Sequence, residues 1–288
     1  MARRVLDSPH LANAVTAIMA AMATPLVWLD ALEGAGRTPG RWALAAWRVV
    51  HLGAMLLVLM LSPSSYQRNN RTALAQQIYL DTVPLLPGFT LLCAVISLVL
   101  TRILVTTAAS YGLSQYALEM VIRVLVLELI PLTAALFVAL RCTIPHGANL
   151  ARMRRRGELD ALRQQGIDPV GRELLPRVVA GVFSTITLAA LTCVITMVLA
   201  YLAVFGFTWA GMGGYTHMFG QVFNPAVTLV FVLKTVFFSV VVALMPVASA
   251  LNDPEGHATR LSAEMQGLVR VFAMLLVIEL VSLVGNYY

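Results

Sequence analysis

The chain has 288 residues, of which 59% are hydrophobic and only 12% are charged. Its mean hydropathy of +0.81 excludes an ordinary water-soluble protein and indicates an integral membrane protein. The net charge of +6 does not indicate nucleic-acid binding, because nearly every basic residue flanks a hydrophobic segment and Lys234 is the sole lysine.

The first forty residues are expected to form a retained cytoplasmic extension. They superficially resemble a signal peptide, but polar residues at 7–10 separate the early arginines from a weak apolar stretch. Residues 41–61 leave two interpretations open. Hydropathy permits a span, although Arg48 and His51 interrupt it, whereas the tryptophans and arginines at one end favour a helix that lies along the cytoplasmic interface. We favour the interfacial helix.

Five later segments are apolar over a length that crosses a bilayer, which takes about 20 residues of helix. Strand-type alternation is absent, so helices rather than a barrel are expected to satisfy the backbone. No internal repeat is evident, and residues 41–288 are predicted to form a single all-α membrane domain. The predicted spans are 83–107, 120–141, 178–205, 226–250 and 267–285.

The distribution of basic residues predicts the topology. The loop 142–176 holds a cluster of arginines, whereas the loops 108–119 and 206–225 contain no lysine or arginine. By the positive-inside rule the first loop is cytoplasmic and the other two face outward. Five spans then place the amino terminus in the cytoplasm and the carboxyl terminus outside.

Glu128 is the most unusual residue, because it lies deep in the second span. An ionised side chain there costs roughly 2.5 to 3.5 kcal/mol on insertion scales, so it must face protein, water or a ligand. Pro131 cannot donate to the carbonyl of Leu127, and we expect the helix to bend beside the carboxylate. Glu128 has either a functional role or a structural one, paired with a cation such as Arg102 or Lys234.

Three other ionisable residues lie in or at the edge of the spans. Arg102 and Lys234 are long enough to snorkel to the interface, although Lys234 has apolar residues on both sides. Glu279 lies inside the last span and poses the same problem as Glu128. We expect two of these four groups to line an internal cavity and two to be structural partners.

The arginine-rich stretch 151–166 is predicted to be a short amphipathic cytoplasmic helix. Leu159 and Leu162 share a face, and Arg156 and Asp160 have the spacing of an i,i+4 ion pair. A solvated or lipid-headgroup-binding basic loop is the alternative.

The end of this stretch is predicted to end one helix and to begin the next. Gly166 ends the helix, and Asp168 and Pro169 fit the cap and the first position of the next helix.

Signatures of catalysis and of cofactor binding are missing. The chain has no phosphate-binding loop, no Cys/His zinc spacing and no disulfide framework. No cofactor or metal is therefore expected in this chain, and any energy from ATP must come from another subunit.

Three segments in sequence order carry a resemblance to a known family. They are "ELIPLTAALFVALR", "ARMRRRGELDALRQQGIDP" and "PRVVAG", supported by "QQIYLDTVPLL", Tyr111-Gly112, "LKTVFF" and the acidic Glu279. Together they resemble the Mla-type (MlaE/YrbE) permeases, the membrane subunits of MCE-associated ABC transporters. The resemblance covers residue 41 to the end.

The resemblance implies an architecture and two sets of site residues. In that family two permease copies enclose a lipid-holding cavity, and a cytoplasmic coupling helix seats on an ATPase. The implied lipid pocket comprises Leu100, Thr107, Ala108, Tyr111, Glu128 and Leu129, to which we add Arg102. The implied coupling element comprises Met153, Glu158, Leu159, Asp160, Ala161, Leu162 and Asp168.

The sequence also departs from the family pattern. The family usually has arginine directly before Glu128, where this chain has Leu127, and a usual glutamine in the first span is Ile103. We expect Arg102 to replace the lost cation. The arginines of the coupling region indicate a divergent branch with its own dedicated ATPase.

The leading hypothesis is a bacterial inner-membrane permease, not itself an enzyme, that moves phospholipid or a similar hydrophobic molecule to or from an MCE-domain protein. It implies a homodimer, an ABC ATPase that binds ATP and Mg, and a place for a small STAS-type cytoplasmic subunit. The rival hypothesis is an ion-coupled secondary transporter with Glu128 and Glu279 as protonatable groups. A third is a membrane scaffold that transports nothing.

Overall fold

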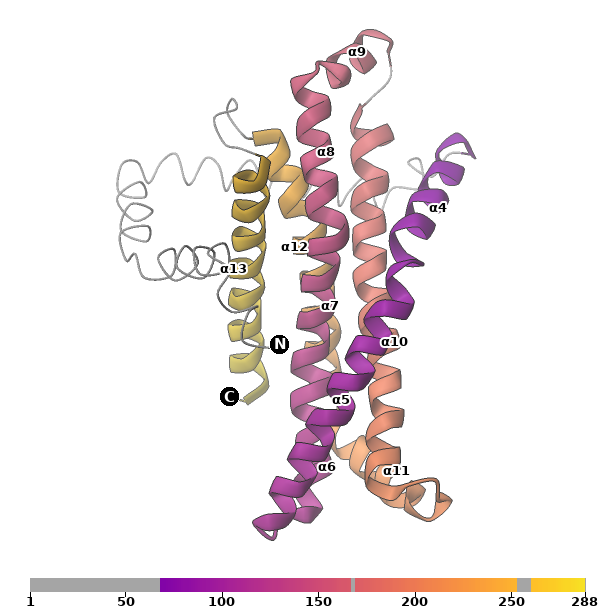
Figure 1. Ribbon diagram of the computed structural model, residues 1–288, viewed down its shortest axis with the longest axis vertical. Helices are drawn as coiled ribbons and strands as arrows, with labels where there is room; N and C mark the ends of the chain where they lie inside the picture. The colour runs from indigo at the N-terminus through magenta and orange to yellow at the C-terminus, as the bar shows by residue number, and fades with distance from the viewer. Residues whose placement is uncertain (1–67, 167–168, 253–259, 288) are drawn as a thin grey trace, which may run out of the picture. The chain divides into compact units, whose positions relative to one another are not determined.

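The computed structural model describes residues 68–166, 169–252 and 260–287, all of which belong to one compact unit (Figure 1). Every regular element in these ranges is a helix, as predicted. The extension 1–40 and the segment 41–61 lie outside the described residues, so both interpretations of the latter stay predictions.

Five helical segments are long and apolar enough to cross a membrane, which confirms the five predicted spans. They are Leu74–Ser110, Leu118–Arg155, Val170–Phe205, Pro225–Leu251 and Gly267–Gly285. The α-helices of the described residues are α4 (Arg68–Thr82), α5 (Leu85–Ser110), α6 (Ser114–Val121), α7 (Ile130–Val138), α8 (Ile144–Arg155), α9 (Glu158–Gln164), α10 (Leu175–Phe205), α11 (Met212–Val222), α12 (Pro225–Asn252) and α13 (Arg260–Tyr287). Of these, α9 and α11 lie between spans.

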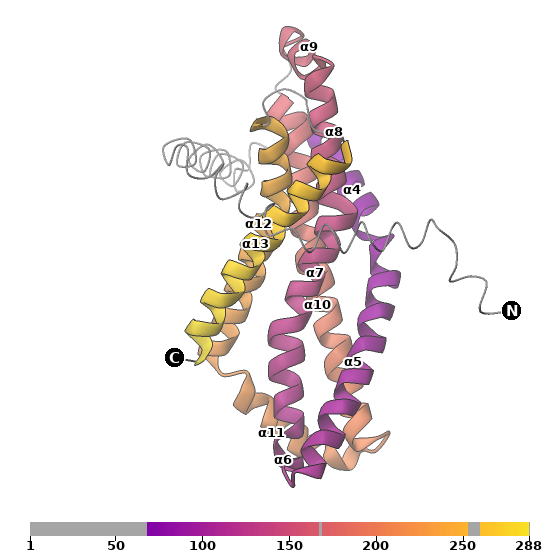
Figure 2. The ribbon, with the colours of Figure 1, turned by 60° about the vertical axis from the view of Figure 1, so that its left-hand side comes forward.

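The arginine-rich α8 and α9 lie at one end of the helical bundle, and α6 and α11 lie at the other (Figures 1 and 2). Helix α10 packs against α4, α5 and α12, and α12 packs in turn against α8 and α13. The loop rich in arginine and the two loops without lysine or arginine therefore lie at opposite ends, as the predicted topology requires. The side of the membrane that each end faces stays a prediction.

Three apolar clusters form the core along the length of the bundle. The central one joins α5, α7, α10, α12 and α13 and includes Phe89, Val138, Leu188, Phe238 and Leu275. A second cluster lies toward α6 and α11, and a third lies beside α8 and α9. Contact with neighbouring helices is thus continuous from end to end.

Three π-helical segments interrupt the second and third spans, and each ends two residues before a proline. They are η2 (Ile122–Leu129) before Pro131, η3 (Ala139–Thr143) before Pro145, and η4 (Val170–Leu174) before Pro176. Proline cannot donate a backbone hydrogen bond, and its ring crowds the preceding turn. The helical turn widens instead, and the N–H group of the residue directly before the proline donates to the carbonyl five residues earlier. The Ile130 N–H, for example, donates to the Leu125 carbonyl.

Hydroxyl pairs hold the first span against the third. The Thr82 and Ser184 hydroxyls lie 2.8 Å apart, and those of Ser97 and Thr196 lie 3.0 Å apart. All four side chains are buried. Small polar residues at such an interface let helices approach closely while satisfying each other's hydrogen bonds.

The stretch 151–166 forms parts of two helices rather than the single one predicted. Gly157 has a φ of +70°, a left-handed conformation that ends α8 and starts α9. The predicted Arg156–Asp160 pair is therefore wrong, because the two residues do not share a continuous helix. Arg156 pairs with Glu158 at 3.6 Å, and Asp160 pairs with Arg163 at 3.7 Å. The predicted stop at Gly166 is confirmed by its φ of +75°.

Candidate functional site

A buried charge cluster connects three of the spans. Lys234 of α12 is only 3% exposed and forms ion pairs with Glu128 of η2 and with Glu279 of α13. The Lys234 Nζ to Glu279 Oε2 distance is 2.8 Å. A lysine and two glutamates that are each costly in a membrane thus stabilise one another.

The backbone beside Glu128 supplies a further acceptor. Pro131 leaves the carbonyl of Leu127 without its usual intrahelical donor, as predicted from the sequence. Lys234 Nζ donates to this carbonyl over 3.2 Å. The ammonium thus donates hydrogen bonds to the Leu127 carbonyl and to Glu128. It pairs with Glu279 by charge alone, because Glu279 Oε2 accepts no hydrogen bond from a described residue.

The surroundings of the charge cluster are largely apolar. The Lys234 ammonium lies 5.7 Å from the centre of the Phe238 ring, a cation–π distance. A cavity of about 10 Å³ beside the cluster is lined partly by Phe231 and Ser282 and approaches the room that one water needs. Two carboxylates face one ammonium here, so the cluster favours a further proton or cation over a further anion.

Arg102 does not take part in this cluster. Its side chain is exposed on α5 and forms no ion pair with a described residue. The cation that lies beside Glu128 is Lys234, so the expectation that Arg102 replaces the missing family arginine is wrong. Its place in the lipid pocket stays a prediction.

An apolar groove of about 200 Å³ runs between α5 and the second span. Of the residues predicted for the lipid pocket, Leu129 lines this groove. The hydroxyls of Ser97 and Thr133 and the thiol of Cys93 are its polar groups. The other lining residues are Phe89, Leu92, Ile96, Leu125, Ile130, Leu136, Phe137 and Leu140.

Glu128 lies in the charge cluster, and the other predicted pocket residues lie further along α5 or directly after it. Leu100 packs against the apolar cluster near α6. Thr107 and Ala108 are in the last turns of α5, and Tyr111, directly after it, is 76% exposed. The structure therefore does not gather the predicted set around one cavity of this chain, and contact of these residues with lipid stays a prediction.

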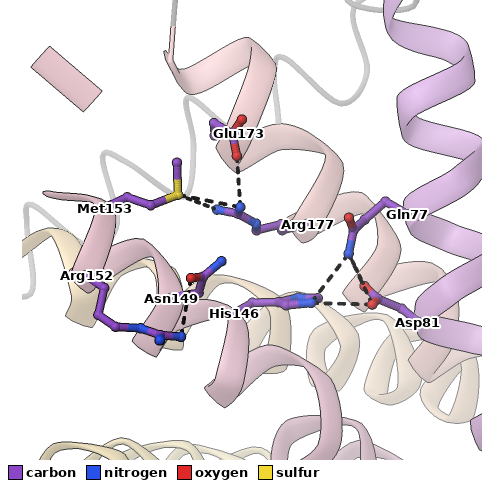
Figure 3. Close-up of polar contacts among 8 residues, drawn as sticks. All are labelled: Gln77, Asp81, His146, Asn149, Arg152, Met153, Glu173 and Arg177. Carbon is purple, nitrogen blue, oxygen red and sulfur yellow. Dashed lines mark hydrogen bonds and ion pairs between the residues drawn. The ribbon is translucent and has the colours of Figure 1, made fainter. Parts of the chain in front are cut away.

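The predicted coupling residues divide into buried and exposed groups. Leu159 is buried among α8, α10 and α12, whereas Asp160 and Ala161 are exposed on α9. The sulfur of Met153 lies 3.7 Å from Arg177 Nη2, and Arg177 also pairs with Glu173 at 2.8 Å (Figure 3). Glu158 and Leu162 are partly exposed, and Asp168 lies outside the described residues.

A polar network between α4 and α8 was not predicted from the sequence. Gln77 donates to Asp81 over 3.1 Å, and His146 Nε2 lies 3.4 Å from Asp81 Oδ1 (Figure 3). The i,i+4 spacing of Gln77 and Asp81 was a usable signal. Nothing in the sequence indicates that His146 lies beside them.

The family model described as "Permease MlaE" matches residues 74–284, about three quarters of the chain. The matched range contains the charge cluster, the apolar groove and the whole of α8 and α9. A comparison with curated proteins found no match for this chain.

Proposed function

This chain belongs to the MlaE permease family, and we propose that it moves phospholipid or a similar hydrophobic molecule between a bacterial inner membrane and an MCE-domain partner. The family assignment makes it a multi-pass membrane permease subunit of an ABC-type transporter, which works with partner subunits and is not itself an enzyme. The cargo, the membrane and the identity of the partners belong to the proposal.

The observation that carries the proposal is the apolar groove. Its lining of hydrocarbon side chains with two hydroxyls suits an acyl chain, which forms no hydrogen bonds. Its volume of about 200 Å³ is below the roughly 300 to 1,000 Å³ of most small-molecule pockets. One protomer would therefore hold part of a two-tailed lipid, which supports a cavity completed by a second copy of the chain.

The helices α8 and α9 supply the proposed contact with the ATPase. They project from one end of the bundle (Figure 1). Asp160 and Ala161 of α9 are exposed to solvent. ATP and Mg would bind in the ATPase, and a small STAS-type subunit would bind on the same side. The MCE partner would meet the opposite end, where α6 and α11 lie. Closure of the ATPase pair would move α9 and reshape the lipid cavity.

The rival hypothesis of an ion-coupled carrier rested on Glu128 and Glu279. In the structure both carboxylates share Lys234, an arrangement that explains their presence as an ion-pair bridge between helices. Membership of an ABC permease family favours coupling to ATP. The ion-coupled carrier requires an ion gradient, whereas the ABC permease requires ATP hydrolysis by its partner.

The decisive experiment is purification of the full chain in mild detergent with its co-purifying partners, followed by reconstitution into vesicles that contain a fluorescent phospholipid. We expect an ATPase and an MCE protein to co-purify, and lipid transfer to require ATP. The control is the same complex with a hydrolysis-deficient ATPase, with an uncoupler of the proton gradient in parallel. Transfer that needs the gradient and no nucleotide would establish the ion-coupled carrier, and a chain with no bound lipid and no transfer would establish the scaffold.

A further inference from the structure

Arg154 makes contacts unlike those of the other arginines in its stretch. Its Nη1 donates to the carbonyl of Leu251 and lies 3.5 Å from the carbonyl of Ala250. Arg156 and Arg163 instead pair with acidic residues close by in the chain. Arg154 therefore connects the last turn of α8 to the carboxyl end of α12, 97 residues away.

The carboxyl end of a helix has carbonyl groups without intrahelical donors and carries a partial negative charge. A guanidinium that donates to those carbonyls satisfies them and balances the charge. Arg154 is thus a cap for α12 supplied by another helix. Its loss would leave the last turn of α12 to fray.

A close backbone contact adds to this cap. A Cβ atom on Gly147 of α8 would lie 2.7 Å from the carbonyl oxygen of Pro246 in α12, so only glycine allows this approach. Pro246 lies inside α12 and cannot donate to the carbonyl of Val242. Helix α12 is therefore weakest where α8 braces it.

Buried apolar side chains complete the contact. Leu150 of α8 and Leu159 of α9 are both in the apolar cluster that contains Leu244, Val247 and Ala250 of α12. Each is at most 9% exposed. The α8–α9 arm (residues 144–164) and the carboxyl-terminal part of α12 thus share a core, a backbone contact and a cap.

We propose that Arg154 and Gly147 fasten the α8–α9 arm to α12, so that α12 carries a displacement of the arm to the charge cluster around Lys234. Lys234 is 17 residues before Leu251, or about 25 Å along the helix. Arg154 and Gly147 are positioning residues that touch no lipid. This inference rests on the proposed function only in that the ATPase moves the arm.

The fastening itself is tested by amide hydrogen exchange on the full chain in complex with its ATPase. Arg154→Gln is expected to speed exchange in the last turn of α12 about tenfold, because hydrogen bonds to a charged group are among the stronger ones. The matched control is Arg155→Gln, since the exposed Arg155 has no hydrogen bond or ion pair to a described residue. Equal exchange in the two variants would overturn the proposal, whether or not the complex transports lipid.

The transmission is tested by measuring ATP hydrolysis and lipid transfer together. Arg154→Gln is expected to retain hydrolysis within about twofold and to lose about tenfold in transfer, and Arg154→Lys, which still donates to carbonyls, should restore transfer. Gly147→Ala should act like Arg154→Gln, and Gly88→Ala, whose added Cβ meets no atom within 4 Å, is its control. A parent complex that hydrolyses ATP without transfer would overturn the proposed function. If the parent complex transfers lipid and the Arg154→Gln complex transfers it equally well, the proposed function stands. The claim that α12 carries the displacement of the arm is then overturned.

Discussion

The ammonium of Lys234 lies 2.8 Å from the carboxylate of Glu279, and this ion pair joins α12 to α13. Among the side chains of α13 that the structure describes, Val271 and Leu275 are buried. The same ammonium contacts Glu128 of the second span. The position of α13 therefore depends on this cation as well as on the apolar contacts of α13 with the central cluster.

Replacement of Lys234 by methionine should destabilise the protein by about 3 to 5 kcal/mol, because it leaves two carboxylates, whose side chains are only 17% and 12% exposed, without a cation. Thermal unfolding in detergent measures the effect. The exposed Arg102→Met is the matched control and should change stability little. Adding Glu128→Gln and Glu279→Gln to Lys234→Met should recover most of the loss. A triple variant as unstable as the single one would contradict the charge explanation.

A photoreactive residue at Leu92 should label lipid that stays bound to the protein. Leu92 lines the apolar groove, whereas its neighbour Leu91 is 68% exposed and lies outside it. After repeated washing in detergent we expect a lipid adduct, detected by mass spectrometry, from position 92 and none from position 91. Equal labelling at both positions would show that the groove has no preference for lipid over the general surface.

The double variant Asp160→Arg with Leu162→Arg should release or uncouple the ATPase while the permease still inserts. Asp160 is 72% exposed through its side chain, so its reversal leaves the fold intact and changes the docking surface. Co-purification of the ATPase and its hydrolysis rate are the measurements. Gln164→Arg with Gln165→Arg, at exposed positions, controls for added positive charge. Undiminished ATPase association in the Asp160 variant would remove the coupling role of α9.

Stability should fall at alkaline pH through Tyr215 of α11. Burial raises the pKa of its phenol above the usual 10.0, and the hydroxyl donates to the carbonyl of Met197 over 3.0 Å. The unfolded chain therefore ionises first as the pH rises, and stability present below pH 10.0 is lost above it. Unfolding midpoints at about pH 8 and about pH 11 measure this loss.

Tyr215→Phe should make that alkaline loss smaller, at the expense of about 1 kcal/mol at neutral pH for the missing hydrogen bond. Tyr116→Phe, at a more exposed tyrosine of α6, should leave the alkaline loss unchanged. The same alkaline loss in the two variants would assign the effect to other groups.

Much of the fold was predictable, because a bilayer imposes length and apolarity on every span. All five spans follow from hydropathy alone, and the stop at Gly166 follows from the conformational freedom of glycine. A departure from the regular α-helix beside Glu128 was also predictable, since Pro131 lacks a backbone donor, and it takes the form of the π-helical η2. The bend itself stays a prediction. Each of these signals lies within a few residues of the feature that it predicts.

Features that depend on contacts between distant segments were not predictable in the same way. Lys234 and Arg102 were equal candidates to pair with Glu128, because hydropathy does not say which face of a helix meets which neighbour. The sequence also did not indicate which arginines of the stretch 151–166 pair with nearby acidic residues and which one contacts a distant helix. Arg154 reaches the end of α12 only because Gly147 and Pro246 bring the two backbones together.

The widened turns of η2 and η3 also affect how the second span is compared with related sequences. Each inserts about one residue beyond the regular repeat, which rotates everything downstream by about 100° around the axis. A helical wheel drawn straight through this span therefore assigns the residues after Pro131 to the wrong side. For the same reason, a related sequence with one residue fewer between 122 and Glu128 would have the equivalent of Glu128 turned away from the equivalent of Lys234.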